Sequence, residues 1–424
     1  MARFSQKSLL LSATALLGSL LCASKPFPRG GGYNYTEKLR GVNLGGWLIL
    51  EPWITPKLFD ATGNSAITDE WTFCALQDRA TAESILNNHW STFYGEDDFK
   101  AIAEAGLNHV RLPIGYWTFD VQEGEPYIQG QEIYINKTVA WARKYGLQVV
   151  IDLYGAPGSQ NGFINSGHLL SFPEWQSNQT NIDRTLAITK TLAQRYANDS
   201  HVIIGPLNES PGYRGDDILN VAKQYYLDSY QELRFPFDDS RESDTPMLIF
   251  DGFRPASTWT GFLTPPTYKG VIMDTHEYQI FTYQLLSLSD DDHIALACNV
   301  SANITAYDLD TMVGEWAPAR TDCARYLNGV GFGTAYDGTL NGSTRVGSCD
   351  GLSGSATTFS DDYRVFLRRF WEAQVISYES GIGWTQWLWK TEEGAGEEWS
   401  YSVGLEYGWI PQDPTDLIYP NICD

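Results

Sequence analysis

Short apolar runs alternate with amphipathic stretches along most of this chain. Several runs are continuously apolar, as expected when both faces of a parallel strand are covered. The pattern predicts eight strands, at Leu39–Asn43, His109–Ile114, Gln148–Leu153, Val202–Leu207, Met247–Asp251, Val271–Thr275, Met312–Gly314 and Gly381–Trp387. It also predicts helices at Glu96–Ala105, Ile135–Tyr145, Ile182–Tyr196 and Ile218–Leu233. A strand–helix alternation repeated about eight times predicts an α/β fold, a single (β/α)8 TIM barrel.

Two polar segments, 238–244 and 334–355, interrupt this pattern and are expected to be loops. The sequence contains no Pro/Ser-rich linker and no internal repeat. We therefore expect one domain over residues 39–424, with extended loops at the C-terminal face of the barrel.

The first residues predict export. Residues 1–24 read as a signal peptide, with a basic start at Arg3 and Lys7, an apolar core over Ser8–Leu21 and small residues before the expected cleavage. The apolar run is too short to span a membrane. Residues 25–38, rich in Gly and Pro, are expected to form a flexible N-terminal segment. A secreted protein, extracellular or in the cell wall, is the resulting expectation.

Sequons of the Asn-x-Ser/Thr type fit that route and predict a glycoprotein with these positions in surface loops. They begin at Asn34, Asn136, Asn178, Asn198, Asn299, Asn303 and Asn341. Five cysteines follow the leader. Cys298, Cys323, Cys349 and Cys423 could form two disulfides, with Cys74 as a buried free thiol.

Composition excludes several classes of function. The net charge of −23 argues against nucleic acid or an anionic membrane as a partner. The six histidines are scattered, and the chain has no H-E-x-x-H, no G-x-S-x-G and no phosphate-loop fingerprint. We expect no metal, no cofactor and a monomer.

The strongest candidate chemistry is a pair of glutamates. Glu209 follows one predicted strand and Glu315 follows another, and a TIM barrel gathers its functional groups at the carboxyl ends of its strands. Two carboxyl groups in one pocket suit cleavage of a glycosidic bond, because one protonates the departing oxygen and the other attacks or stabilises C1. Gly314 beside Glu315 permits a close backbone approach, and Trp316 is expected to form a wall.

Other strand ends carry polar or aromatic residues, each with two interpretations. Arg111 either pins a loop or keeps one glutamate ionised. His276 and Tyr278 either form a satisfied polar cluster or tune the neighbouring carboxylates. The last predicted strand region holds Trp384, Trp387 and Trp389, of which we expect Trp387 to be the platform for a sugar ring.

Six motifs, in this order along the chain, resemble the fungal exo-β-1,3-glucanases of glycoside hydrolase family 5. They are Arg40–Trp47 continuing to Glu51-Pro52-Trp53, Gly106–Trp117, Gly155–Phe163, His276–Phe281, Gly314–Trp316 and Trp384–Glu392. The resemblance implies a retaining (β/α)8 hydrolase with Glu209 as proton donor and Glu315 as nucleophile. It implies that the terminal glucose is held by Glu51, Asn165, Asn208, His276 and Tyr278, with Phe163 and Phe281 at the entrance and Trp387 as the floor. It further implies disulfides Cys298–Cys423 and Cys323–Cys349.

The chain departs from the family pattern at two positions. Ser210 replaces the usual Pro after Asn208-Glu209, which alters only the loop after the acid. Tyr154 stands where the family has His, which places a bulkier phenol near the pocket and is expected to narrow it or lower activity.

Our hypothesis is a secreted glucan exo-1,3-β-glucosidase that releases glucose from the non-reducing ends of β-1,3-glucan by double displacement. Two alternatives remain open. One is a cell-wall glucan transglycosylase, which would need acceptor subsites beyond Phe163 and Phe281. The other is a wall-binding protein with a site weakened by Tyr154.

Overall fold

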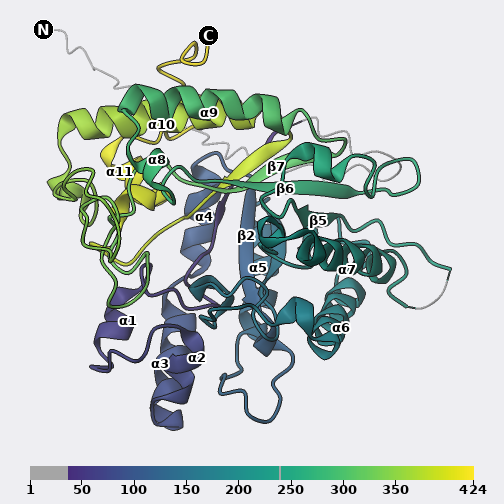
Figure 1. Ribbon diagram of the computed structural model, residues 1–424. Helices are drawn as coiled ribbons and strands as arrows, with labels where there is room; N and C mark the ends of the chain where they lie inside the picture. Colours follow the sequence, from purple (N-terminus) through teal and green to yellow (C-terminus); the bar gives the residue numbers. More distant parts are fainter. Residues whose placement is uncertain (1–36, 238–239) are drawn as a thin grey trace, which may run out of the picture.

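Eight parallel strands close into a barrel in the order in which they occur in the chain (Figure 1). This computed structural model describes residues 37–237 and 240–424, so the predicted signal peptide and nearly all of segment 25–38 lie outside the described residues. The strands are β1 Leu39–Asn43, β2 His109–Gly115, β3 Gln148–Gly155, β4 Val202–Gly205, β5 Met247–Phe250, β6 Val271–Glu277, β7 Asp310–Trp316 and β8 Gly383–Gln386. The predicted fold class is confirmed.

Helices surround the barrel, with α6 and α7 side by side and α9 and α10 packed along each other (Figure 1). They are α1 Pro56–Asp60, α2 Glu70–Ala75, α3 Arg79–Thr92, α4 Glu96–Glu104, α5 Glu132–Lys144, α6 Gln179–Arg195, α7 Asp216–Arg234, α8 Tyr283–Leu286, α9 Asp290–Ile304, α10 Asp361–Tyr378 and α11 Tyr401–Tyr407. The four predicted helices correspond to α4–α7. Helix α6 begins before its prediction because Asn178 caps it, accepting a hydrogen bond from the Thr180 amide.

Several strand boundaries differ from the prediction, because pairing with the neighbouring strand decides where a strand ends. Strand β7 continues through Glu315 and Trp316, which were expected to follow it. Strand β8 ends at Gln386, so Trp387 and Trp389 lie in the segment after it. Strands β4 and β5 are shorter than predicted, and only Ile204 and Met247 pair between them.

Alternation along the strands separates the inside of the barrel from the side that faces the helices. In β3, Val149 and Ile151 belong to the large core under the helices, whereas Val150 lies in a second cluster. That second cluster closes the amino end of the barrel, and we call it the apolar end. Its members are Leu39, Val150, Ile203, Leu248, Ile272, Met312 and Ile382.

Charged side chains fill the barrel directly above the apolar end. Arg111 from β2 contacts Asp152 Oδ2 at 2.7 Å, Glu315 Oε1 at 2.5 Å and Asp274 Oδ2 at 3.7 Å. His276 Nε2 lies 3.3 Å from Asp274 Oδ2. We call these five residues the charged layer. Each charge in it has an opposite partner, which is what makes their burial tolerable.

Two disulfides hold the C-terminal third together. Cys298 joins Cys423, and Cys323 joins Cys349, while Cys74 is free and buried. These pairings confirm those that the family resemblance implies. The first ties α9 to the C-terminal segment, and the second closes the long loop after β7.

The predicted sequons within the described residues all lie at exposed positions: Asn136, Asn178, Asn198, Asn299, Asn303 and Asn341. The expectation that all of them lie in loops is wrong, because Asn136 is in α5 and Asn299 and Asn303 are in α9. Asn34 lies outside the described residues. Among residues 37–237 and 240–424, no helix combines the length and apolar character needed to cross a bilayer.

Candidate active site

A β-bulge at Gly314 turns Glu315 into the barrel. Strands β6 and β7 pair Thr275 with Val313, and the next pair is His276 with Glu315, so Gly314 is passed over. A side chain at Gly314 would place its Cβ 2.2 Å from Asp274 Oδ1, and the Gly314 amide instead donates to that oxygen at 2.7 Å. Simple alternation would point Glu315 towards the helices, and the extra residue reverses this.

Glu209 follows β4 in an unusual backbone conformation. Its φ is +43°, in the left-handed region that costs energy for a residue with a side chain. Glu209 Oε1 is 2.9 Å from His276 Nδ1, and Glu209 Oε2 accepts a hydrogen bond from Asn165 Nδ2 at 3.1 Å. These contacts hold the carboxyl group over the mouth of the barrel.

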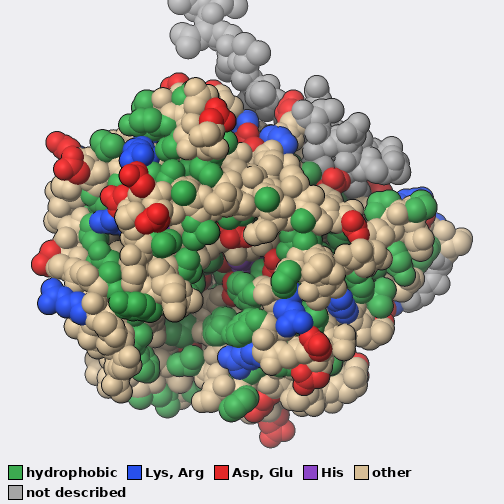
Figure 2. All heavy atoms as spheres, turned by 45° about the horizontal axis from the view of Figure 1, so that its top comes forward, with side chains coloured by type: hydrophobic (Ala, Val, Ile, Leu, Met, Phe, Trp, Pro, Cys, Tyr) green, Lys and Arg blue, Asp and Glu red, His purple; other side chains and the backbone are tan. Residues whose placement is uncertain are grey.

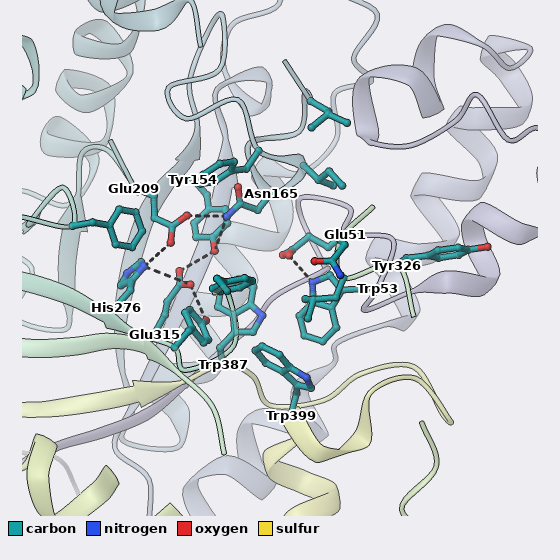
Figure 3. A pocket seen from close by; sticks show the side chains of 18 of the residues that line it. Glu51, Trp53, Tyr154, Asn165, Glu209, His276, Glu315, Tyr326, Trp387 and Trp399 are labelled. Atoms are coloured by element: carbon teal, nitrogen blue, oxygen red, sulfur yellow. Dashed lines mark hydrogen bonds and ion pairs between the residues drawn. The ribbon is translucent and has the colours of Figure 1, made fainter. Parts of the chain in front are cut away.

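The two glutamates face one another across a short gap. One atom from each of Glu209, His276 and Glu315 lies within 4.8 Å of the other two. Figure 3 shows the Glu209 and Glu315 carboxyl groups pointing towards the same space, with His276 on one side and Tyr154 and Asn165 on the other. Retaining glycosidases place these groups about 5–5.5 Å apart and inverting ones about 6.5–9.5 Å. The observed gap matches the retaining arrangement.

Every hydrogen-bond partner of Glu315 is a donor. Oε1 accepts from Arg111 Nη1 at 2.5 Å and from Tyr154 Oη at 2.8 Å, and Oε2 accepts from Tyr278 Oη at 3.0 Å. Burial raises the pKa of the Glu315 carboxyl, and the charges of His276 and Arg111 oppose that rise. The set of donors favours the ionised form, which is the form that can attack.

His276 is enclosed by carboxylates. Burial alone would lower the pKa of His276, but the charges of Glu315 and Asp274 outweigh it and hold that pKa well above its usual range. A protonated imidazole then donates through Nδ1 to Glu209 and through Nε2 to Asp274. The spacing of Glu209, His276 and Glu315 would also admit a small cation, yet both ring nitrogens already have carboxylate partners.

These groups lie at the base of a cavity of about 620 Å³. Figure 2 shows the hollow in this face, with green side chains along its wall and red and purple ones at depth. Ten of the predicted site residues line it: Glu51, Tyr154, Phe163, Asn165, Glu209, His276, Tyr278, Phe281, Glu315 and Trp387. Arg111 and Asn208 do not. Arg111 Nη2 donates to Asn208 Oδ1 at 2.8 Å behind the pocket wall, so Arg111 acts on the site through Glu315.

Glu51 is a second kind of carboxyl group in the same cavity. Its Oε2 accepts from Trp53 Nε1 at 3.2 Å, and its Oε1 has no hydrogen-bond partner. Burial, followed by the charge of Glu315, raises the pKa of Glu51 to about 8. Glu51 is therefore neutral below that pH and carries a proton that it can donate to a sugar hydroxyl.

Tyr154 and Trp387 pack face to face along the cavity floor. Their rings are 5.5 Å apart with an interplanar angle of 13°. A Cβ at Gly45 would lie 2.7 Å from the Trp387 ring, which explains why glycine stands there. Tyr154 lines the cavity, and its hydroxyl group donates to Glu315 Oε1 at 2.8 Å. Trp316, expected as a wall, is instead buried against Trp371, Tyr378 and Trp384.

The sequence analysis did not predict two aromatic residues at the rim of the cavity. Beside Phe281, which is 60% exposed, Tyr213 and Phe253 also line the cavity and are 47% and 39% exposed. Their rings meet edge to face at 5.8 Å. Tyr213 follows β4 and Phe253 follows β5, so their position after strand ends was the available signal. Asp152 and Asp274 were also missed, although each shares the inward side of its strand with a residue of the apolar end.

Comparisons with known proteins agree on the family. Residues 75–322 match the family described as Cellulase (glycosyl hydrolase family 5). The chain is 43% identical over 427 residues to a protein named probable glucan 1,3-beta-glucosidase A from Aspergillus niger, with 99% of both chains covered. It is 41% identical to a glucan 1,3-beta-glucosidase from Blumeria graminis, with 98% of this chain and 96% of the relative covered.

Among solved structures, rutinosidase from Aspergillus niger superposes with a TM-score of 0.68 at 19% identity, covering 88% of this chain and 98% of that one. At this identity the likeness speaks for the fold alone.

Proposed function

The chain belongs to glycosyl hydrolase family 5 and is a glycoside hydrolase. From this premise we propose that it is an exo-acting β-1,3-glucosidase that releases glucose from the non-reducing ends of β-1,3-glucan, with retention at C1. The observation that carries the proposal is the gap between Glu209 and Glu315, whose nearest ligand atoms lie within 4.8 Å of each other and of His276. That gap leaves room for a sugar carbon but not for an additional water in line with it.

The roles follow from what each carboxyl group contacts. Glu315, which contacts the fixed positive charge of Arg111, attacks C1 as the carboxylate. Glu209, whose partners are His276 and Asn165, gives a proton to the departing oxygen and later takes one from water. Asn165, His276, Tyr278 and Glu51 line the space around that carbon and supply hydrogen bonds to the hydroxyl groups of the terminal glucose. Trp387 offers an apolar face to the sugar ring.

Two observations support β-1,3-glucan as the substrate. The relatives that match almost the whole chain are named for action on 1,3-β-glucan. The half-buried ring of Phe163 and the exposed ring of Phe281 also line the cavity, where further sugar units of a glucan chain would pass.

Digestion of laminarin, a β-1,3-glucan, followed by product identification tests the activity. We expect glucose as the first product and no early internal fragments, with slower release from β-1,4- and β-1,6-linked glucans. NMR during the first turnovers distinguishes the anomers, and β-glucose is expected. Initial α-glucose, or oligosaccharides before glucose, would contradict the proposal.

Azide separates the two carboxylate roles. In Glu209→Ala the covalent intermediate still forms on an activated aryl glucoside, and azide, which needs no general base, should intercept it to give β-glucosyl azide. In Glu315→Ala azide should replace the missing nucleophile and give α-glucosyl azide. The same azide anomer from both variants would refute the assignment.

Transglycosylation is a second candidate, favoured by the Tyr213–Phe253 pair on the rim. Two further exposed rings in the same cavity extend the aromatic surface beyond Phe163 and Phe281. Sugars stack on such faces, so an acceptor glucan held there would compete with water for the glycosyl intermediate. At high laminarioligosaccharide concentration we expect products longer than the substrate, and fewer of them from Tyr213→Ala. A wall-binding protein without catalysis would instead bind laminarin and release no glucose.

We also infer that the protein is secreted, after removal of residues 1–24, and that it acts as a monomer. The leader pattern and the exposed sequons support this route. Expression in a fungal host checks it through the N-terminal sequence of the protein in the medium, its mass before and after glycan removal, and light scattering. Retention of an intact leader inside the cell would refute the inference.

A further inference from the structure

The two oxygens of Glu315 have unequal surroundings. Oε1 accepts hydrogen bonds from Arg111 Nη1 at 2.5 Å and Tyr154 Oη at 2.8 Å. Oε2 accepts one from Tyr278 Oη at 3.0 Å, and His276 Nδ1 lies 3.6 Å away. A carboxylate that attacks uses one oxygen for the new bond and turns the other into a carbonyl. The hydrogen-bond partners of Glu315 therefore influence which oxygen attacks C1 and which becomes the carbonyl oxygen.

Tyr154 points into the barrel by the ordinary alternation of β3, two residues after Asp152. Pairing between β2 and β3 passes from Ile114–Leu153 to Gly115–Gly155, so Tyr154 has no partner in the ladder. Its ring lies on Trp387 and under the Arg111 guanidinium, whose central carbon is 5.5 Å from the ring centroid. With 1% of its surface exposed, the side chain is held in one orientation.

A second contact fixes the direction of the phenol proton. Asn165 Nδ2 donates to Glu209 Oε2 at 3.1 Å and makes a longer contact of 3.5 Å with Tyr154 Oη. An amide N–H cannot accept, so the phenol oxygen receives from Asn165 and its single proton is left for Glu315 Oε1. Tyr154 thus links the residue that holds one glutamate to the other glutamate.

We propose that Tyr154 is a positioning residue that keeps Glu315 Oε1 as the future carbonyl oxygen and leaves Oε2 to attack C1. This inference rests on the proposed function. It also gives Tyr154, the departure from the family pattern, a task in the reaction in place of the obstruction that the sequence suggested.

The bond changes show which step of the reaction the Tyr154 hydroxyl group assists. In the first step a lone pair on Oε2 forms the bond to C1, the electrons of the glycosidic bond pass to the departing oxygen, and that oxygen takes the proton of Glu209. Glu315 is then a neutral ester. In the second step water attacks C1 and gives a proton to Glu209, while the electrons of the C1–Oε2 bond return to Glu315. Tyr154 binds the regenerated charge, so its hydroxyl assists the second step more than the first.

Tyr154→Phe removes the hydroxyl and keeps the ring on Trp387. We expect slower breakdown of the intermediate when the substrate is 2,4-dinitrophenyl β-glucoside, whose leaving group makes the first step fast. A hydrogen bond to a charged group corresponds to about a tenfold or larger factor, so kcat should fall about tenfold, KM should fall by a similar factor, and kcat/KM should change little. The 2-deoxy-2-fluoroglucosyl adduct, followed by intact mass, should also reactivate more slowly.

The pH profile gives a readout that a merely structural role would not change. Loss of a donor to the ionised form raises the pKa of Glu315, so the acid limb of kcat/KM should move about half to one unit higher. The other charged or titratable groups that face or influence Glu315 are Arg111, Tyr154, Asp152, Glu209, Asp274, His276, Tyr278 and Glu51. None of these is altered in Tyr154→Phe except Tyr154 itself.

Tyr278→Phe is the matched control, because it removes a donor from Oε2. Its loss should lower kcat/KM, since it affects the oxygen that attacks. Tyr154→His is a second variant that keeps a polar ring but is too short to reach Oε1, and it should resemble Tyr154→Phe in the breakdown step. If Tyr154→Phe does not fold, Tyr154→His decides the question.

The possible outcomes distinguish a failure of the proposed function from a failure of the role proposed for Tyr154. If the wild-type protein forms no adduct and releases no glucose, the proposed function fails. If the wild type forms the adduct but Tyr154→Phe and Tyr154→His reactivate at the wild-type rate, only the role of Tyr154 is overturned. A fall in kcat/KM without a fall in KM, matching Tyr278→Phe, would also overturn it.

Discussion

The same strands form both ends of the barrel interior, but the side chains at one end are apolar and those at the other are charged. Along β3 the inward residues are Val150, Asp152 and Tyr154, and along β6 they are Ile272, Asp274 and His276. The apolar end gains from burial of each side chain separately, at about 25 cal/mol for each Å² removed from water. The charged layer is tolerable only because its members satisfy one another. We therefore expect the apolar end to govern stability and the charged layer to govern chemistry.

The largest expected effect is on catalysis. Glu315→Gln and Glu209→Gln each preserve the shape of the side chain, and each should lower kcat on laminarin by about 10⁴-fold or more. The melting temperature should change little by comparison, because both side chains line the cavity and each substitution keeps their shape. Steady-state rates with calorimetry on the same samples check this. If stability and activity fell together in these variants, the assignment of stability to the apolar end and of chemistry to the charged layer would be wrong.

Arg111 should affect both properties, because it holds Glu315 and also pairs with two buried aspartates. Arg111→Met leaves Asp152 without its buried counter-ion, and leaves Asp274 and Glu315 with His276 alone, which should lower the free energy of unfolding by about 3–5 kcal/mol. Activity should fall as well, since Glu315 loses a donor at 2.5 Å. Urea unfolding and laminarin assays measure the two losses. An active Arg111→Met protein would mean that Tyr154 and Tyr278 suffice to hold Glu315.

The apolar end offers the opposite test. Met312→Ala removes a fully buried side chain from this end and should lower the free energy of unfolding by about 2–5 kcal/mol. Below the new melting temperature kcat and KM should stay close to the wild-type values. Ile203→Ala, at the same end, is the companion variant. A large change in kcat for both would show that the apolar end also shapes the active site.

A pH-dependent effect concerns Glu398, a buried carboxyl group that has no cationic partner of the kind found in the charged layer. Neither oxygen of Glu398 has a hydrogen-bond partner in good geometry, and the residue is 0% exposed. Burial raises its pKa to about 8, an effect that Ser353 and Trp399 oppose only in part. Because the folded pKa lies above the unfolded one of about 4.3, the protonated side chain stabilises the fold fully at low pH. That contribution is lost as pH rises towards 8, at up to about 1.4 kcal/mol per pH unit.

Glu398→Gln stays neutral, so its stability should fall less than that of the wild type between pH 5 and pH 8. Unfolding curves at several pH values measure the difference, and Glu104→Gln on the exposed face of α4 is the control. Parallel pH profiles for wild type and Glu398→Gln would contradict the assignment of this charge.

Local sequence pattern was enough to predict the barrel, since the eight strands and helices α4–α7 are recognisable from their own residues. It also indicated that Glu209 and Glu315 end up at one face, because parallel strands share their carboxyl end. The disulfide pairing needed the family resemblance, because four cysteines permit three pairings. The catalytic roles of the two glutamates remain predictions that the variants above test.

The sequence alone therefore determined the architecture and the candidate chemistry, whereas pairing between strands decided how the site works. Only the register of β6 against β7 turns Glu315 inward past Gly314, and only closure of the barrel brings Tyr154 of β3 to Glu315 Oε1 of β7. Arg111 was recognisable as a charge, but its place behind the pocket depends on Asp152 and Asp274 from two other strands. The physical reason is that periodicity is a property of a single strand, while a bulge or a buried ion pair exists only between strands.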